Sequence, residues 1–331
     1  VSKDYVLEKI GDDKVLNMSP TFVLTKENVE RCVRIVSQVG VDPIMDALKA
    51  NVDVVLCGRC CDTAIYAAPA LLAGMDEGLA VHMAKIMECG ALCAEPMTAS
   101  DCLLATIEKD SFILEPVNPD RKCTIARVAA HTMYEQGNPY YVYEPNGYAD
   151  LRESEYVQMS NRAVKVTNSI FHHAQQPTLK LEGAMLEGYK TITIAGVNDP
   201  ETIVRIDEIL ETVRGFVAKN MEGKIPESEY TITLHKYGVP LTGEDWGTRV
   251  PDCSLGIVIE VVASTQEIAN TICALARART LHTDYPGRKS SAGNLAFPYS
   301  PSDIPCGPVF SFGIYHLVKV DDLSETSKTY F

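Results

Sequence analysis

The apolar run VDVVLC at residues 52–57 most restricts the fold, because Gly58 and a helical pattern follow it directly. A continuous β-branched run is typical of a strand buried on both faces of a parallel sheet. The helical pattern has Asp62 in its first turn, and a second one covers GLAVHMAKIMECGALCA. A strand, a glycine turn and a helix in this order predict a doubly wound, Rossmann-like α/β domain over residues 1–150.

The second half of the chain has a different pattern. The order βαββαβ is that of a ferredoxin-like sandwich, so we expect an α+β domain over 151–331 with a long loop at 283–309. The Pro, Asn, Gly and Tyr-rich stretch at 136–151 is the expected boundary. Strand-like runs cover 191–197, 229–238, 254–263 and 310–320; helical patterns cover 26–50 (interrupted near Gly40 and Pro43), 199–220 and 265–282.

Charge and cysteine content exclude several classes of protein. A net charge of −14 argues against a nucleic-acid partner, which needs a basic face. The apolar runs have the length of strands and fall short of the ~20 residues of a membrane span. Eleven cysteines scattered over 331 residues predict reduced thiols in the cytoplasm rather than a disulfide framework.

Three of these cysteines, Cys57, Cys60 and Cys61, lie within five positions, and Cys89 and Cys93 are one helical turn apart. Zinc or an iron–sulfur cluster is one interpretation. No second knuckle with metal-ligand spacing follows, so we expect small buried thiols and neither a metal nor any other required cofactor. A reactive thiol at Cys60, near a helix N-terminus, is an open alternative.

Arg59 and Asp62 are placed where open α/β sheets bind their ligands, at the carboxyl end of a predicted strand. The helix N-terminus there offers free N–H groups to an anion, and Arg59 adds a bidentate donor. The alternative is an Arg59–Asp62 pair that braces the turn.

Other polar residues form candidate sites, and each of these also has a purely structural interpretation. His82 and Lys85 share one helix face, which suits either an acid–base pair or solvated surface. His131 lies in the segment AHTMYE. Lys180 and Glu182 lie on the same side of a predicted strand, as a polar site or as an ion pair.

The longest polar segment, residues 281–310, joins a helix to the last strand. A loop of this length is either functional or ordered by its packing, and its apolar anchors favour a binding or catalytic role. Its candidate site residues are His282, Arg288, Asn294, Ser302 and Asp303.

Five strings run through nearly the whole chain in one order: VDVVLCGRCCDTAIYAAP, HMAKIMECGALCAE, AAHTMYE, KLEGAMLEGYKTITIAGVNDP and LHTDYPGRKSSAGNLAFPYSPSD. Together they resemble the acyclic terpene utilization (AtuA) family. The resemblance implies a bacterial cytoplasmic protein of pathways that degrade acyclic terpenoids and other branched acids as CoA esters. Family members usually begin with a glycine-rich α/β segment upstream of the first residue of this chain.

We therefore expect a lyase that hydrates or dehydrates a branched acyl-CoA or hydroxy acid, with coenzyme A as part of the anionic substrate. Arg59 would bind the anion, one of His82, His131 or His282 would act as base, and Lys85 or Lys180 would polarise the carbonyl. The alternative is a non-catalytic or partial subunit. A homo-oligomer, or a complex with a chain that supplies the upstream segment, is the expected assembly.

Overall fold

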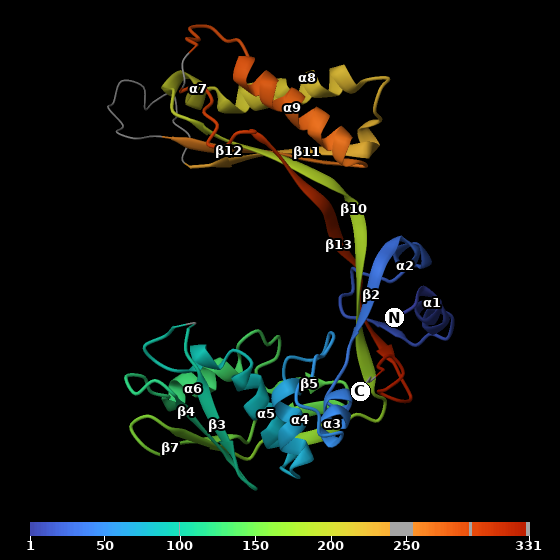
Figure 1. The fold of residues 1–331 in the computed structure, drawn as a ribbon, viewed down its shortest axis with the longest axis vertical. Coiled ribbons are helices and arrows are strands. Elements are labelled where there is room, and N and C mark those ends of the chain that lie inside the picture. Colours follow the sequence, from blue (N-terminus) through green and yellow to red (C-terminus); the bar gives the residue numbers. More distant parts are fainter. Residues whose placement is uncertain (99, 239–253, 291–292, 329–331) are drawn as a thin grey trace. The chain divides into compact units, whose positions relative to one another are not determined.

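The computed structural model describes residues 1–98, 100–238, 254–290 and 293–328, and Figure 1 shows the course of the chain. The chain divides into two compact units, Val1–Ala184 with Phe312–Phe331, and Met185–Ser311. The division falls after Ala184 and after Ser311 rather than near residue 150. The stretch at 136–151 lies inside the first unit, where it contributes a hairpin.

Short helices and short antiparallel sheets make up the first unit. One sheet has the strand order β3-β4-β8-β7 and another has the order β5-β6-β9. The strands are β1 (Val15–Asn17), β2 (Cys32–Gln38), β3 (Leu103–Ile107), β4 (Phe112–Pro116), β5 (Tyr141–Glu144), β6 (Gly147–Asp150), β7 (Glu155–Gln158), β8 (Val164–Thr167) and β9 (Ile170–His173). The helices are α1 (Lys3–Gly11), α2 (Lys26–Arg31), α3 (Asp42–Lys49), α4 (Ala64–Leu72), α5 (Glu77–Met87), the 3-10 turn η1 (Gly90–Cys93) and α6 (Ile125–Thr132).

Helix α5 is the centre of the first unit, since each of its residues from Gly78 to Ile86 is buried. Asp76 caps the helix by accepting a hydrogen bond from the Leu79 N–H, which satisfies one of the free amides of the first turn. The sequence pattern predicts α4 and α5, and both are present. The close approach of α5 to β9 depends on Gly78, because a Cβ there would lie 2.4 Å from the Ser169 carbonyl oxygen, just before β9.

The predicted strand at 52–57 and the predicted doubly wound parallel sheet are both wrong. Residues 52–57 belong to no strand, and the side chains of Val54 and Leu56 are 80% and 96% exposed. A β-branched run favours extended backbone, but a strand also needs a neighbour to bond to, and local sequence cannot supply one. In the described ranges, each pair of strands whose register is known is antiparallel. The isolated bridge between Val39 and Cys60 is parallel.

The helical pattern predicted over 26–50 is also only partly right. Helix α2 ends at Arg31 and the chain continues as β2, in which Cys32 and Ile35 are buried while Val33 is exposed. The apolar spacing of CVRIV fits a helix and a strand equally well over so short a run. Pairing of β2 with β10 (Thr178–Val197) decides the outcome.

The second unit packs helices against an antiparallel sheet. Its element order, β10–α8–β11–β12–α9–β13, is the predicted one, and the strands lie in the order β13-β10-β12-β11. Figure 1 shows α8 and α9 on one side of β11 and β12. The elements are α7 (Pro200–Val204), α8 (Ile206–Met221), the 3-10 turn η2 (Glu227–Glu229), β11 (Tyr230–Tyr237), β12 (Leu255–Ala263), α9 (Gln266–His282) and β13 (Asp303–Lys319).

Strand β13 begins earlier than expected, so the loop after α9 ends at residue 302 rather than 309. The prolines and glycines of DIPCGPV favour a loop locally. Thr193 of β10 donates a hydrogen bond of 2.6 Å to Asp303, which fixes the start of β13 beside β10. This contact joins residues that are 110 positions apart, so local sequence patterns cannot predict it.

We predict that Gly78→Ala lowers the free energy of unfolding by roughly 1–3 kcal/mol, because a methyl group at this position meets the backbone of β9. Chemical denaturation measures the change. Gly11→Ala is the matched control: it also adds one methyl group to a helix of the first unit, and no atom lies within 4 Å of it. Equal unfolding midpoints for the two variants would contradict the close packing of α5 on β9.

Candidate active site

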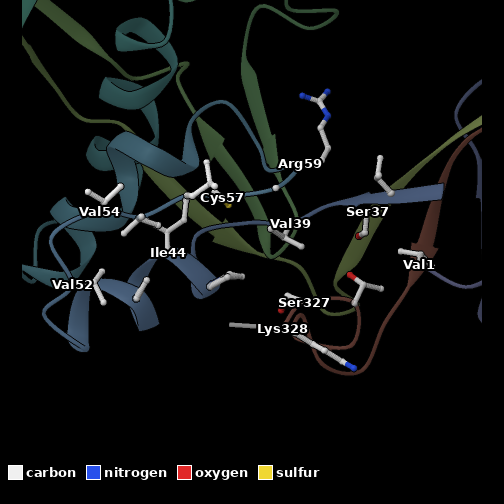
Figure 2. Close-up of a pocket in the computed structure, with 17 residues that line it drawn as sticks. Val1, Ser37, Val39, Ile44, Val52, Val54, Cys57, Arg59, Ser327 and Lys328 are labelled. Carbon is white, nitrogen blue, oxygen red and sulfur yellow. The ribbon is translucent and has the colours of Figure 1, made fainter. Parts of the chain in front are cut away.

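The turn at residues 57–63, which precedes α4, positions the first group of the site. The Val39 N–H donates to the Arg59 carbonyl at 3.2 Å, and the Cys61 N–H donates to the Val39 carbonyl at 2.8 Å. These bonds hold the backbone on either side of Cys60. In Figure 2 the Arg59 side chain points away from Ile44 and the other labelled apolar residues of the neighbouring groove.

Arg59 is held by Glu182 of β10. The Arg59 Nε and Nη2 donate to the two carboxylate oxygens of Glu182 at 3.0 and 3.2 Å, a bidentate pair. The Nη1 of Arg59 lies 3.8 Å from Asp62, which is longer than a hydrogen bond. Since a guanidinium has five N–H donors, Arg59 keeps donors for an incoming carboxylate or phosphate.

Lys180 approaches the same carboxylate from its own strand. Residues two apart on a strand share a face, and the Lys180 Nζ lies 3.1 Å from Glu182. The same Nζ lies 5.0 Å from the centre of the Tyr315 ring, a cation–π contact. Burial alone would raise the pKa of Glu182, but the hydrogen bonds from Arg59 and Lys180 outweigh it and lower the pKa. Glu182 is therefore a charged anchor for both cations.

Glu144, at the end of β5, is a site residue that the sequence analysis missed. Its carboxylate accepts a hydrogen bond of 2.5 Å from the Thr63 hydroxyl and another from the Cys61 thiol. Burial raises the pKa of Glu144 to about 7, against the lowering effect of these two donors, and the charges of Glu88 and Asp62 raise it further. A carboxyl of this kind exchanges a proton near neutral pH. The sequence feature that could have indicated Glu144 is an acidic residue between the apolar run YVY and the turn PNG.

Lys85 and Glu88 form an ion pair at the C-terminal end of α5, with side chains only 7% and 8% exposed. Burial raises the pKa of Glu88, the hydrogen bond from Lys85 opposes this, and the negative charges of Asp62 and Glu135 add to the rise. The buried pair thus lies within electrostatic range of the turn that carries Asp62. Lys85 is therefore a buried, ion-paired residue rather than solvated helix surface.

His131 of α6 is close enough to α5 to feel the charge of Lys85. The residue is 6% exposed, its Nε2 has no hydrogen-bond partner in the described part of the chain, and its ring stacks on Tyr134 at 5.4 Å. Burial lowers the pKa of His131 and outweighs the hydrogen bonds to the Ile86 and Cys89 backbone, which raise it. The charges of Lys85 and Arg127 lower the pKa further, so the ring is neutral at neutral pH. A neutral imidazole with an uncommitted nitrogen can accept a proton.

A small pocket of about 230 Å³ opens beside His131. Leu92, Met97 and Met133 line it, together with Arg127 and His131 itself. The flexible, apolar methionine side chains adapt to branched hydrocarbon. The pocket therefore suits a short apolar group placed next to an imidazole.

The other two candidate histidines are placed differently. His82 is fully buried, and its two ring nitrogens lie 2.8 Å from the Ser169 hydroxyl and 3.0 Å from the Thr132 hydroxyl. Burial lowers the pKa of His82 to about 3, and with both nitrogens occupied it braces α5 against its neighbours. His282 is exposed at the last position of α9, in the second unit.

The remaining candidates belong to the second unit and serve mainly as structural contacts. Asn294 is buried and donates to the Thr202 hydroxyl at 2.9 Å, while Asp303 accepts from the Arg277 Nε at 2.7 Å. Arg288 donates to the Leu281 carbonyl at 2.8 Å, which closes the loop on α9. Ser302 is partly buried just before β13. The first unit thus contains Arg59, Asp62, His82, Lys85, His131, Lys180 and Glu182, and the second contains His282, Arg288, Asn294, Ser302 and Asp303.

A second, larger hollow of about 440 Å³ adjoins the turn of Arg59 (Figure 2). Its wall is polar and apolar in about equal parts, and includes Ile44 of α3 and the open segment at 52–57. Among the described residues, no three His, Cys, Asp or Glu side chains gather as a metal site, and no helix is long and apolar enough to cross a membrane.

Comparison with known proteins gives one match. A family model described as "Acyclic terpene utilisation family protein AtuA" matches residues 1–240. That range includes the turn of Arg59, α5, α6 and the strand that carries Lys180 and Glu182. Searches of curated proteins and of solved structures returned no match.

The pKa of Glu144 predicts a pH-dependent stability. Its value of about 7 in the folded chain lies above the ordinary value of 4.5, so folding favours the neutral carboxyl. This stabilisation is complete below about pH 4.5 and is lost as the pH rises through 7. The Glu144→Gln variant stays neutral, so its melting temperature should rise relative to the native chain between about pH 5 and about pH 8.

Thermal melts at the two pH values measure this difference. The exposed Glu153→Gln is the matched control and should show a difference that does not change with pH. A constant offset for Glu144→Gln as well would show that its carboxyl is ionised throughout this range.

Proposed function

The chain belongs to the acyclic terpene utilisation family AtuA, and from that premise we propose that it is a cytoplasmic enzyme that hydrates or dehydrates a branched acyl-CoA or hydroxy acid. The family name implies a role in the use of acyclic terpenes. The observation that carries the proposal is the Arg59 guanidinium, which Glu182 fixes while part of its donor set stays open. The first unit also holds the Glu144 carboxyl with a pKa near 7 and the His131 ring, whose Nε2 has no hydrogen-bond partner in the described part of the chain.

Arg59 binds the negatively charged part of the substrate. Glu182 fixes the orientation of the guanidinium through two hydrogen bonds, which leaves the Nη1 donors facing Asp62 at 3.8 Å. Asp62 is exposed and held only loosely, so an incoming carboxylate or phosphate can displace it. A preoriented guanidinium loses little conformational entropy on binding.

In this proposal, proton transfer is assigned to His131 and Glu144 of the first unit. In the dehydrating direction, the His131 Nε2 accepts the proton from the α-carbon, and the electron pair of that C–H bond becomes the new C=C bond. The β-carbon–oxygen bond breaks, and the neutral Glu144 carboxyl gives its proton to the leaving hydroxyl, which departs as water. The Lys85 ammonium stabilises the negative charge that develops on the carbonyl oxygen. Hydration is the reverse sequence.

The apolar part of the substrate fits the pocket beside His131. Met97 and Met133 offer adaptable surface, and a volume of about 230 Å³ holds a short branched chain rather than a long one. Coenzyme A enters this scheme only as the thiol portion of the substrate's thioester and not as a bound cofactor.

We predict that the chain consumes a 3-methyl-branched 2-enoyl-CoA in water, and that His131→Gln lowers kcat by about 100-fold or more, which is the usual share of a general base. Loss of the ultraviolet absorbance of the conjugated enoyl thioester follows the reaction. His235→Gln, on β11, is the matched control and should keep the native rate.

Full activity in the His131 variant would contradict its role as base. No turnover of branched enoyl-CoAs or of the matching hydroxy acids by the purified chain would contradict the proposed function itself.

A second candidate function, that of a subunit completed by another polypeptide, is favoured by the open segment at 52–58. In the described part of the chain its backbone groups take part in no backbone hydrogen bond, and Val54 and Leu56 are exposed. Unpaired, extended, apolar backbone is a template for strand pairing between chains. A second copy of this chain is the partner that every preparation contains.

We predict that the purified chain self-associates as its concentration rises, and that Leu56→Lys returns it to the monomer, because a charge opposes pairing along the open segment. Light scattering coupled to size exclusion measures the mass. Val117→Lys, at an exposed valine elsewhere in the first unit, should leave the association unchanged. A native chain that stays monomeric at all concentrations would refute self-pairing.

A further inference from the structure

The proposed chemistry makes no use of two thiols in the turn of Arg59. Cys57 and Cys60 are separated by Gly58 and Arg59, and their side chains are hydrogen-bonded to each other. Both are partly exposed and pack beside Ile44 of α3. The two thiols thus form a Cys-x-x-Cys pair that packs on one apolar cluster, and neither is a lone thiol.

The backbone lets the two sulfurs approach further. Cys60 is fixed by the bridge to Val39, whereas Cys57 ends the open segment, whose backbone is bonded to no strand in the described ranges. Gly58 lies between them in open space, since a Cβ added there would have no atom within 4 Å. One anchored and one movable cysteine can adopt the narrow range of torsions that a disulfide requires.

The hydrogen bond also distinguishes the two thiols. Burial raises the pKa of Cys60 to about 11, and the charge and hydrogen bond of Cys57 contribute to the rise. The Cys60 S–H therefore donates to the Cys57 sulfur. Because a thiol with a raised pKa is a poor attacking group, we assign the first attack to Cys57 and the second to Cys60.

We propose that Cys57 and Cys60 form a reversible disulfide with a low-molecular-weight disulfide such as oxidised glutathione as the oxidant. The Cys57 thiolate attacks one sulfur of glutathione disulfide, which releases one glutathione thiolate and leaves a mixed disulfide on Cys57. Cys60 loses its proton and attacks the Cys57 sulfur, which releases the second glutathione. Two protein thiols are oxidised to one disulfide, one glutathione disulfide is reduced to two thiols, and the two protons pass to the released glutathiones.

The disulfide would act on the residue enclosed by the pair. Arg59 lies inside the ring that the bond closes, so its backbone loses the freedom that lets the guanidinium meet both Glu182 and an incoming anion. We expect weaker anion binding in the oxidised chain. This consequence rests on the proposed function, whereas formation of the bond does not.

Trypsin offers a direct test, because it cleaves after Arg59, between the two cysteines. Digestion yields peptide 50–59, which contains Cys57, and peptide 60–85, which contains Cys60 and Cys61. The chain is incubated with oxidised glutathione until the exposed Cys102 carries glutathione, then alkylated, digested and analysed by mass spectrometry without reduction. We expect the two peptides to appear linked, with the mass of their sum less two hydrogen atoms, and to separate after dithiothreitol.

Two variants assign the bond. Cys60→Ser should abolish the linked pair and leave glutathione on Cys57, while Cys61→Ser should retain the linked pair. Cys61 is the matched control because it shares the peptide with Cys60 but directs its thiol to Glu144. Unlinked peptides in the native chain while Cys102 is modified, or a linked pair that persists in Cys60→Ser, would overturn the proposal.

Discussion

The double hydrogen bond from Arg59 to Glu182 is the contact on which the site depends. It joins a turn near residue 60 to a strand near residue 180, and the same carboxylate holds Lys180. Two cations on one carboxylate keep it charged, since their hydrogen bonds outweigh the effect of burial on its pKa. The guanidinium is thereby fixed in direction while part of its donor set stays open.

Local patterns in the sequence predict α4, α5 and the order of elements in the second unit, because these depend on helical spacing and on caps such as Asp76. They also single out Arg59 with Asp62, and Lys180 with Glu182, but as separate pairs. Only tertiary pairing brings them together. The segment at 52–57 shows that local patterns can also predict an element that does not form. Its β-branched residues favour extended backbone, but no neighbouring strand bonds to it and no strand is present there.

Surroundings, rather than residue type, separate the three histidines. His82 has both nitrogens occupied in the core, and His282 is exposed in the second unit. Of the three, His131 combines burial with an uncommitted nitrogen beside a buried lysine. Glu144 follows the same logic, since burial raises the pKa of this acidic hairpin residue to about 7 even though the hydroxyl and the thiol that donate to it lower the pKa.

The central claim is that Arg59 holds an anionic substrate in the first unit. Titration calorimetry of the chain with a branched enoyl-CoA tests it most directly, with Arg59→Gln beside Arg152→Gln, whose guanidinium pairs with Asp150 instead. We expect binding to weaken by about 10-fold or more in Arg59→Gln, because a charge-assisted hydrogen bond is lost, and to be unchanged in Arg152→Gln. Equal affinity in the native chain and in Arg59→Gln would contradict this claim.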